Sequence, residues 1–169
     1  SIPKGVSVPG AELVLRARTL APKATTRIIV NCAGRTRSII GTQSLINAGI
    51  PNPVSALRNG TIGWTLAGQS LVQGAAQRFP EVDEATQKQA AASAKAVAYR
   101  AGVGRARMDE LLTWLAETTR TTYFFDVRTP EEFAAGHVMG AQSAPGGQLV
   151  QETDHYAPVR GARIVLCDT

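Results

Sequence analysis

An internal repeat constrains this chain more than any other feature of its sequence. Residues 1–33 align without gaps to residues 137–169, at an offset of 136 positions. The two segments share nine identical positions, which are Ser7/Ser143, Pro9/Pro145, Gly10/Gly146, Leu13/Leu149, Val14/Val150, Ala21/Ala157, Pro22/Pro158, Arg27/Arg163 and Ile28/Ile164. A period this long exceeds that of stacked solenoid repeats and predicts tandem domains, with the chain beginning inside one copy and ending inside the next.

The repeat predicts a division into three parts. Residues 1–75 form the C-terminal part of one domain, residues 76–102 a helical connector, and residues 103–169 the N-terminal part of a following domain. The chain lacks an initiator Met and stops at "RIVLCDT", directly after an expected strand, so we expect a fragment of a longer protein. In the repeat register Cys32 corresponds to Asp168, and Cys167 corresponds to Asn31.

The hydrophobic pattern predicts an α/β fold with a parallel sheet. Short apolar runs at 27–31, 54–57, 122–127 and 141–144 are typical of strands, and helical patterns cover 38–48, 81–101 and 130–135. The segment 60–75 is expected to hold a loop and a helix. Met108, Leu111, Leu112 and Leu115 have the spacing of a helix that faces the core. Strands that alternate with helices form parallel sheets, and sites in such sheets lie beyond the carboxyl ends of the strands.

Composition excludes several classes of partner. Of the 169 residues 44% are hydrophobic and 18% charged, with no long apolar stretch and no signal-peptide pattern, so we expect no membrane partner and a cytoplasmic location. A net charge of +5 suits an anionic ligand, but scattered basic residues and only 5% aromatic residues argue against nucleic acid. The two cysteines are expected to be reduced thiols, and no metal or other cofactor is expected.

Cys32 lies at a place where a thiol becomes reactive. In "IIVNCAGRTRSII" it follows the strand 27–31 and precedes a helix expected to start at Ser38. The turn's N–H groups, the positive end of that helix, Arg35 and Arg37 would all favour a thiolate. Such a nucleophile can attack an electrophilic sulfur and carry it as a persulfide. A lone cysteine at a strand end is more often a small buried hydrophobic residue, and we keep that interpretation for Cys167.

Two motifs resemble those of the rhodaneses, a family of sulfurtransferases. "VNCAGRTRS" resembles their active-site loop, which a cysteine opens and which would here comprise residues 32–37. "DVRTPEEFAAGHVMGA" resembles the family's Asp-x-Arg strand, Glu-Phe helix and Gly-His turn, matched by Asp126, Arg128, Glu132, Phe133, Gly136, His137, Gly140 and Ala141. The resemblance covers residues 1 to about 75 and about 105 to 169, and it implies a rhodanese-like parallel sheet flanked by helices.

The resemblance also implies roles for individual residues. Cys32 matches the nucleophile that forms the persulfide. The residues that would bind the substrate around it are Ala33, Gly34, Arg35, Thr36, Arg37 and Ser38. The loop arginines would favour thiosulfate as the donor over mercaptopyruvate, and a thiol or cyanide would accept the sulfur. Asp126, Arg128 and His137 match positions that are mainly architectural in the family.

The order of the two motifs departs from the family. There the Asp-x-Arg half precedes its own cysteine half, whereas here it follows it. Residues 103–136 would supply the missing strand and helix to the Cys32 half, either within the chain as a circular permutation or between chains in a domain-swapped homodimer.

Two alternative functions stay open at this point. Cysteine phosphatases and arsenate reductases use a similar anion loop, but theirs has one more residue between cysteine and arginine than separates Cys32 from Arg37. The shorter ring suits a sulfane sulfur better than a phosphate. The other alternative is a non-catalytic rhodanese-like module that binds or regulates other domains. Asp168, at the nucleophile position of the second copy, favours that role for the second copy.

Overall fold

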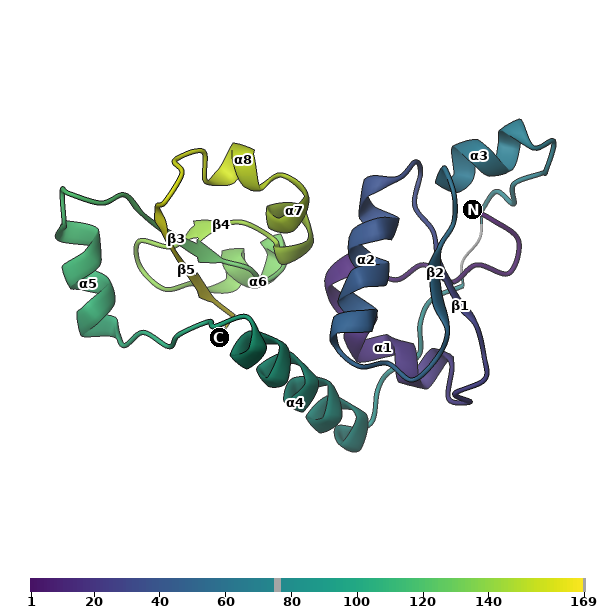
Figure 1. Ribbon diagram of the computed structural model, residues 1–169, viewed down its shortest axis with the longest axis horizontal. Coiled ribbons are helices and arrows are strands. Elements are labelled where there is room, and N and C mark those ends of the chain that lie inside the picture. The colour runs from purple at the N-terminus through teal and green to yellow at the C-terminus, as the bar shows by residue number, and fades with distance from the viewer. Residues whose placement is uncertain (75–76, 169) are drawn as a thin grey trace. The chain divides into compact units, whose positions relative to one another are not determined.

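The computed structural model describes residues 1–74 and 77–168 (Figure 1). The chain divides into two compact units, Ser1–Val103 and Gly104–Thr169, and each is described by itself. Parallel strands joined by helices build both units, which confirms the expected α/β fold class. The predicted boundary at residues 75–76 lies outside the described residues.

Two short parallel strands form the centre of the first unit. β1 (Ile28–Val30) pairs with β2 (Val54–Ala56), with Ile28 opposite Val54, and helix α2 (Thr36–Asn47) forms the crossover between them. β-branched residues suit this pleated and partly buried surface. The strands predicted at 27–31 and 54–57 are confirmed, and each is shorter than expected.

Helix α2 begins two residues earlier than the sequence indicated. The expected start was Ser38, but the first helical residue is Thr36. The Ser38 hydroxyl donates to the Arg35 carbonyl at 2.9 Å instead of capping the helix, because Ser38 already lies inside the first turn. At the other end Gly49 adopts a φ of +70°, and the Ile50 N–H donates to the Leu45 carbonyl at 3.1 Å. A left-handed glycine of this kind is a common helix terminator.

The core of the first unit lies on one face of β1. Helix α1 (Leu13–Leu20), which follows a short 3₁₀ turn (Gly10–Glu12), packs there with α2, and their buried side chains meet around Leu45. The buried members of this cluster are Ala17, Val30, Leu45 and Ile50. The sequence analysis did not predict α1, although Leu13, Val14, Ala17 and Leu20 have helical spacing.

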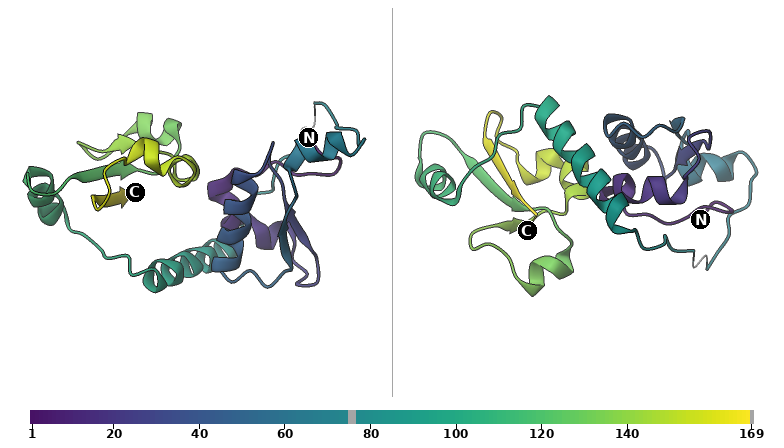
Figure 2. Two further views of the ribbon diagram at one scale, coloured as in Figure 1. Left: turned by 45° about the horizontal axis from the view of Figure 1, so that its top comes forward. Right: turned by 90° about the horizontal axis from the view of Figure 1, so that it is seen from below.

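Two further helices complete the first unit. α3 (Gly60–Leu66) follows β2, within the segment where a loop and a helix were expected. α4 (Glu84–Arg100) lies within the predicted helix 81–101 and contacts α1, and Figure 2 shows it as one uninterrupted helix. The Asp83 side chain accepts a hydrogen bond from the Thr86 N–H at 2.7 Å and so caps the start of α4. Among the described residues, no helix is both long and apolar enough to cross a bilayer.

The second unit contains a three-stranded parallel sheet. β3 (Thr122–Asp126) lies between β4 (Gln142–Ser143) and β5 (Arg163–Cys167). Helices α5 (Met108–Ala116), α6 (Pro130–Ala135), α7 (Gly146–Gln151) and α8 (Thr153–Tyr156) surround it. One face of β3 buries Phe124 with Leu111 and Ala141, and the other buries Phe125 with Ala144 and Leu149.

The predicted apolar stripe of α5 is only partly right. Leu111 is buried against the sheet, but Met108, Leu112 and Leu115 are exposed. The pattern correctly predicted a helix and was wrong about how many of its residues face the core. A narrow sheet of three strands, one of them only two residues long, offers too little surface to cover the whole stripe.

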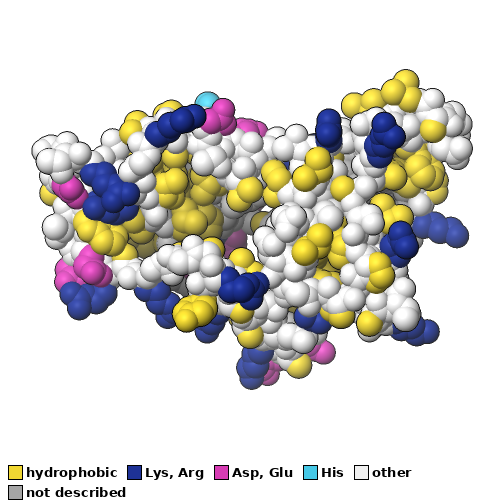
Figure 3. All heavy atoms as spheres, viewed as in Figure 1, with side chains coloured by type: hydrophobic (Ala, Val, Ile, Leu, Met, Phe, Trp, Pro, Cys, Tyr) yellow, Lys and Arg dark blue, Asp and Glu magenta, His cyan; other side chains and the backbone are white. Residues whose placement is uncertain are grey.

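The equivalent strands β1 and β5 are covered on opposite faces. In β1, Val30 is buried by α1 and α2, whereas Ile29 on the other face is 57% exposed. In β5, Val165, the repeat counterpart of Ile29, packs into the cluster around Phe124, whereas Ile164 and Leu166 are 44% and 53% exposed. Figure 3 shows hydrophobic side chains at the molecular surface. The face of β1 that is exposed in the first unit thus corresponds to the face of β5 that is packed in the second unit, and the reverse holds for the other face.

Candidate active site

Cys32 lies beyond the carboxyl end of β1. The strand ends at Val30 and α2 begins at Thr36, so the thiol belongs to the short turn between them. This is the edge of a parallel sheet where loops from neighbouring strands meet. Cys32 is only partly buried.

Several groups of the turn surround the Cys32 sulfur. The Cys32 Sγ donates to the Ser38 Oγ at 3.6 Å, and the backbone N–H groups of Ser38 and Gly34 also act to lower the pKa of the thiol. Partial burial by itself raises the pKa of the thiol, but these hydrogen bonds and the charge of Arg37 outweigh it. The net effect is a Cys32 pKa below that of an ordinary cysteine, and a larger thiolate fraction at neutral pH.

The residues predicted to bind the substrate differ in exposure, and Gly34 is half-buried within the turn. Ala33, Arg35, Thr36 and Arg37 are exposed around the turn, where they can meet a ligand. Ser38 is buried beneath the turn, with its hydroxyl between the Cys32 sulfur and the Arg35 carbonyl. Its contacts are therefore with the turn itself.

The first residues of α3 hold the turn from outside. The Thr61 N–H donates to the Cys32 carbonyl at 2.9 Å, and the Ile62 N–H donates to the Ala33 carbonyl at 3.1 Å. The Thr61 hydroxyl donates to the same Ala33 carbonyl, also at 3.1 Å. These bonds direct the carbonyl groups of the turn toward α3 and leave its N–H groups free for the sulfur.

Gly60 allows α3 to approach the turn this closely. Its φ is +55°, and a Cβ atom at this position would lie 2.1 Å from the Cys32 carbonyl oxygen. No side chain fits at that distance, so the contact between α3 and the turn requires glycine. The sequence shows "RNG" directly after the second strand, and this signal of a tight turn was the only indication of the contact.

A hollow of about 300 Å³ adjoins the turn. Its lining residues are Arg35, Ser38, Ile39, Ala56, Leu57, Arg58 and Asn59. Arg58 was missed by the sequence analysis, although its position after the carboxyl end of β2 could have indicated it. Cys32 is not among its lining residues, but with Arg35 and Arg58 in its wall the hollow suits a small anion near the turn.

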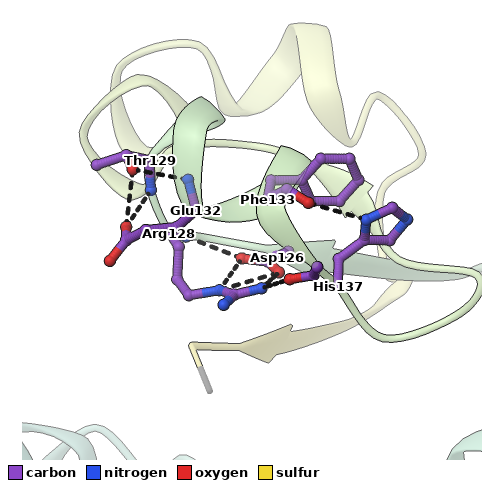
Figure 4. Close-up of polar contacts among 7 residues, drawn as sticks. Asp126, Arg128, Thr129, Glu132, Phe133 and His137 are labelled. Carbon is purple, nitrogen blue, oxygen red and sulfur yellow. Dashed lines mark hydrogen bonds and ion pairs between the residues drawn. The ribbon is translucent and has the colours of Figure 1, made fainter.

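The Asp-x-Arg motif of the second unit is an internal clamp (Figure 4). Asp126 is 1% exposed, and its carboxylate accepts hydrogen bonds from the Arg128 backbone N–H at 3.0 Å and from the Arg128 Nη2 at 2.6 Å. The same Nη2 donates to the Gly136 carbonyl at 2.7 Å. The hydrogen bonds from Arg128 hold the pKa of Asp126 below its usual range. The pair thus fastens the end of β3 to the turn after α6.

The neighbouring polar residues also serve the local fold. Thr129 and Glu132 form a capping box at the start of α6, with the Thr129 hydroxyl 2.8 Å from the Glu132 carboxylate. The His137 ring stacks on Phe133 with 3.8 Å between ring centroids, and its Nδ1 lies 3.0 Å from the Phe133 carbonyl (Figure 4). Asp126, Arg128 and His137 are thus brought together within the second unit, in contacts that shape the turn.

The repeat counterpart of the Cys32 turn has different electrostatics. Burial and the neighbouring Asp126 carboxylate raise the pKa of Cys167. Asp168, at the position that corresponds to Cys32, is exposed and carries no thiol. Within residues 1–74 and 77–168, no cluster of three or more His, Cys, Asp or Glu side chains could hold a metal ion.

Of the comparisons with known proteins, the one with solved structures found a match. No family model and no curated protein matches the chain. Among solved structures, the crystal structure of a thiosulfate sulfurtransferase from Pseudomonas aeruginosa is 67% identical over the whole of this chain, with a TM-score of 0.91. The chain spans 32% of the length of that protein.

Proposed function

Because this chain belongs to the rhodanese family, we propose that Cys32 takes a sulfane sulfur from thiosulfate as a persulfide and passes it to a thiophilic acceptor. The supporting observation is the environment of the Cys32 sulfur, where amides, a hydroxyl and an arginine lower the thiol pKa. The similar protein from Pseudomonas aeruginosa is a thiosulfate sulfurtransferase, which supports the same donor.

The first step is a displacement at sulfur. The Cys32 thiolate attacks the outer sulfur of thiosulfate, a new S–S bond forms at Cys32, and the S–S bond of thiosulfate breaks. Sulfite leaves with the electron pair of the broken bond. The product is a Cys32 persulfide, so charge and atoms balance without any cofactor.

Positive charge around the turn favours thiosulfate as the donor. Arg35 and Arg37 are exposed beside the sulfur, and Arg58 lines the adjoining hollow with Arg35. Guanidinium groups bind oxyanions through paired hydrogen bonds, so these side chains would stabilise the departing sulfite group.

The second step regenerates the thiolate. A cyanide ion or a thiolate attacks the outer sulfur of the persulfide, and the Cys32 sulfur leaves as the thiolate. The turn that stabilised the original anion stabilises this leaving group in the same way. We place this chemistry in the cytoplasm, where thiols are kept reduced, and cell fractionation followed by immunoblotting tests that location.

Intact-mass measurement tests the proposal directly. After incubation with thiosulfate and removal of excess reagent, the protein should gain the mass of one sulfur atom, and cyanide should remove it with release of thiocyanate. The Cys32→Ala variant should show neither change, while Cys167→Ala should behave as the wild type. A wild-type protein that never gains sulfur would contradict the proposal.

For the second unit, a non-catalytic role is better supported. Its counterpart of the nucleophile is Asp168, and its remaining thiol has a raised pKa. We propose that this unit contributes binding or architecture without forming a persulfide. If Cys167 carries sulfur after thiosulfate treatment, this assignment is wrong.

We also propose that a second copy of the chain completes the Cys32 domain. β1 has β2 on one edge, and β3 in the second unit pairs with β5, which is the repeat counterpart of β1. A strand such as β3 would therefore pair with the other edge of β1. The helix α5 that precedes it would then pack over Ile29, as Leu111 of α5 packs in one cluster with Val165 in the second unit. Residues 1–75, 76–102 and 103–169 would then act as half-domain, connector and half-domain in a swapped homodimer.

Sedimentation measurements test this assembly. The wild type should sediment as a dimer, and Ile29→Glu should shift it toward the monomer because a charge would be buried at the new interface. Ile46→Glu is the matched control, since Ile46 is similarly exposed but lies on α2. A wild type that stays monomeric at high protein concentration would contradict the homodimer.

A further inference from the structure

The Ala33 carbonyl accepts two hydrogen bonds from α3. One comes from the Ile62 N–H and the other from the Thr61 hydroxyl, both at 3.1 Å. The preceding carbonyl, that of Cys32, accepts a bond from the Thr61 N–H at 2.9 Å. Thr61 therefore contacts two successive peptide groups of the turn, once through its backbone and once through its side chain.

Planarity of the peptide connects this contact to the sulfur. The Ala33 carbonyl and the Gly34 N–H are the two ends of one peptide group, and in a trans peptide they point in opposite directions. The Gly34 N–H is one of the groups that lower the pKa of the Cys32 thiol. Holding the oxygen toward α3 therefore directs the N–H toward the sulfur.

We propose that Thr61 is a positioning residue of the sulfur site: its hydroxyl fixes the Ala33–Gly34 peptide so that the Gly34 N–H faces Cys32. A hydrogen bond to the carbonyl also polarises the peptide and strengthens the bond that its N–H donates. Thr61 acts only through this peptide. The inference rests on the proposed function in taking Cys32 as the reacting residue.

The effect of the Thr61 hydroxyl on Cys32 can be separated from that of the charged groups near the turn. Arg35 lies on the turn, Arg37 in the first turn of α2 and Arg58 after the end of β2, and none of these side chains bonds to the Thr61 hydroxyl. A substitution that removes only the hydroxyl of Thr61 therefore leaves the arginines in place. A change in thiol reactivity would then report on the peptide.

The test compares Thr61→Val with two other variants. Valine keeps the shape of threonine and lacks the hydroxyl, whereas Thr61→Ser keeps the hydroxyl. Thr65→Val is the matched control, because the Thr65 hydroxyl donates to the Thr61 carbonyl at 3.0 Å, within α3. The measurement is the pH profile of Cys32 alkylation by iodoacetamide, with Cys32 and Cys167 resolved as separate peptides by mass spectrometry.

Thr61→Val should shift the alkylation profile of Cys32 to higher pH and slow the reaction at neutral pH by about two- to fivefold, the effect of a modest hydrogen bond transmitted through one peptide. Thr61→Ser and Thr65→Val should keep the wild-type profile. The proposal is overturned if Thr61→Val leaves the profile unchanged, or if Thr65→Val or Thr61→Ser shifts it equally. Should the valine variant not fold, Thr61→Ala is held to the same criterion.

Sulfur loading separates this inference from the proposed function. If the wild type gains no sulfur from thiosulfate but Thr61→Val still changes the alkylation profile, the proposed function fails and the positioning role stands. If the wild type gains sulfur and the profile of Thr61→Val is unchanged, the positioning role fails and the proposed function stands.

Discussion

Replacing Ser38 by alanine tests how the turn stabilises the sulfur. The Ser38 hydroxyl is buried, lies 3.6 Å from the Cys32 Sγ and donates to the Arg35 carbonyl. In this arrangement the neutral thiol donates to Ser38. When the thiol loses its proton, the hydroxyl hydrogen can turn to the sulfur and stabilise the anion. Alanine removes this response and keeps the backbone N–H of residue 38.

The expected size follows from the two charge states. A hydrogen bond to a charged group contributes about 1.5–3 kcal/mol, and one between neutral groups about 0.5–1.5 kcal/mol. The difference, about 1–1.5 kcal/mol, corresponds to a roughly five- to twelvefold smaller ratio of thiolate to thiol. Because only the thiolate reacts, alkylation of Cys32 at neutral pH should slow by the same factor.

Alkylation by iodoacetamide across a pH series measures this ratio. Ser44→Ala is the matched control, since the Ser44 hydroxyl donates to the Ile40 carbonyl at 2.9 Å on the same helix and has no contact with Cys32. The control should keep the wild-type rate. If Ser38→Ala also keeps the wild-type rate within twofold while remaining folded, the hydroxyl does not stabilise the thiolate and the reasoning is refuted.

Three further predictions follow from the same contacts. Gly60→Ala should break the contact between α3 and the turn and abolish the fast alkylation of Cys32. The control Gly68→Ala is also at positive φ but has open space around its Cβ, so it should lose only about 1 kcal/mol of stability and keep the reactivity of Cys32. Equal Cys32 reactivity in the two variants would contradict the close contact. Cys32, with its lowered pKa, should be alkylated from lower pH than Cys167, whose pKa is raised, and the reverse order would contradict the electrostatics. Leu45→Ala should lower the free energy of unfolding in urea by about 2–5 kcal/mol, and the exposed control Ile46→Ala should lower it by much less; similar losses would mean that Leu45 is not at the core.

Local patterns in the sequence were sufficient to place Cys32 in a turn after a strand and to predict most of the elements. A β-branched run, a turn that contains a glycine and a helical pattern predict a strand, a loop and a helix without any distant contact, so Cys32 could be placed at the end of β1. The contribution of Ser38 was harder to predict. Its sequence position suggested a helix cap, and only the actual start of α2 places its hydroxyl beneath the sulfur.

Burial depends on neighbours that the local pattern does not contain. The spacing of Met108, Leu111, Leu112 and Leu115 correctly predicts a helix, but how many of them are covered depends on the width of the sheet beside it. The same holds for Ile29. It lies in a continuous apolar run, which is typical of a strand covered on both faces, but it is exposed in its own unit.

By itself the sequence determined the repeat, the strand–turn–helix around Cys32 and the positive charge of that turn, because each of these depends on residues close together in the chain or on a direct comparison of its segments. Only the tertiary structure decided that α3 contacts the turn, where Gly60 lies against the Cys32 carbonyl and the Thr61 hydroxyl donates to the Ala33 carbonyl. These partners are almost thirty positions apart in sequence, and the fold of β1, α2 and β2 between them brings them into contact.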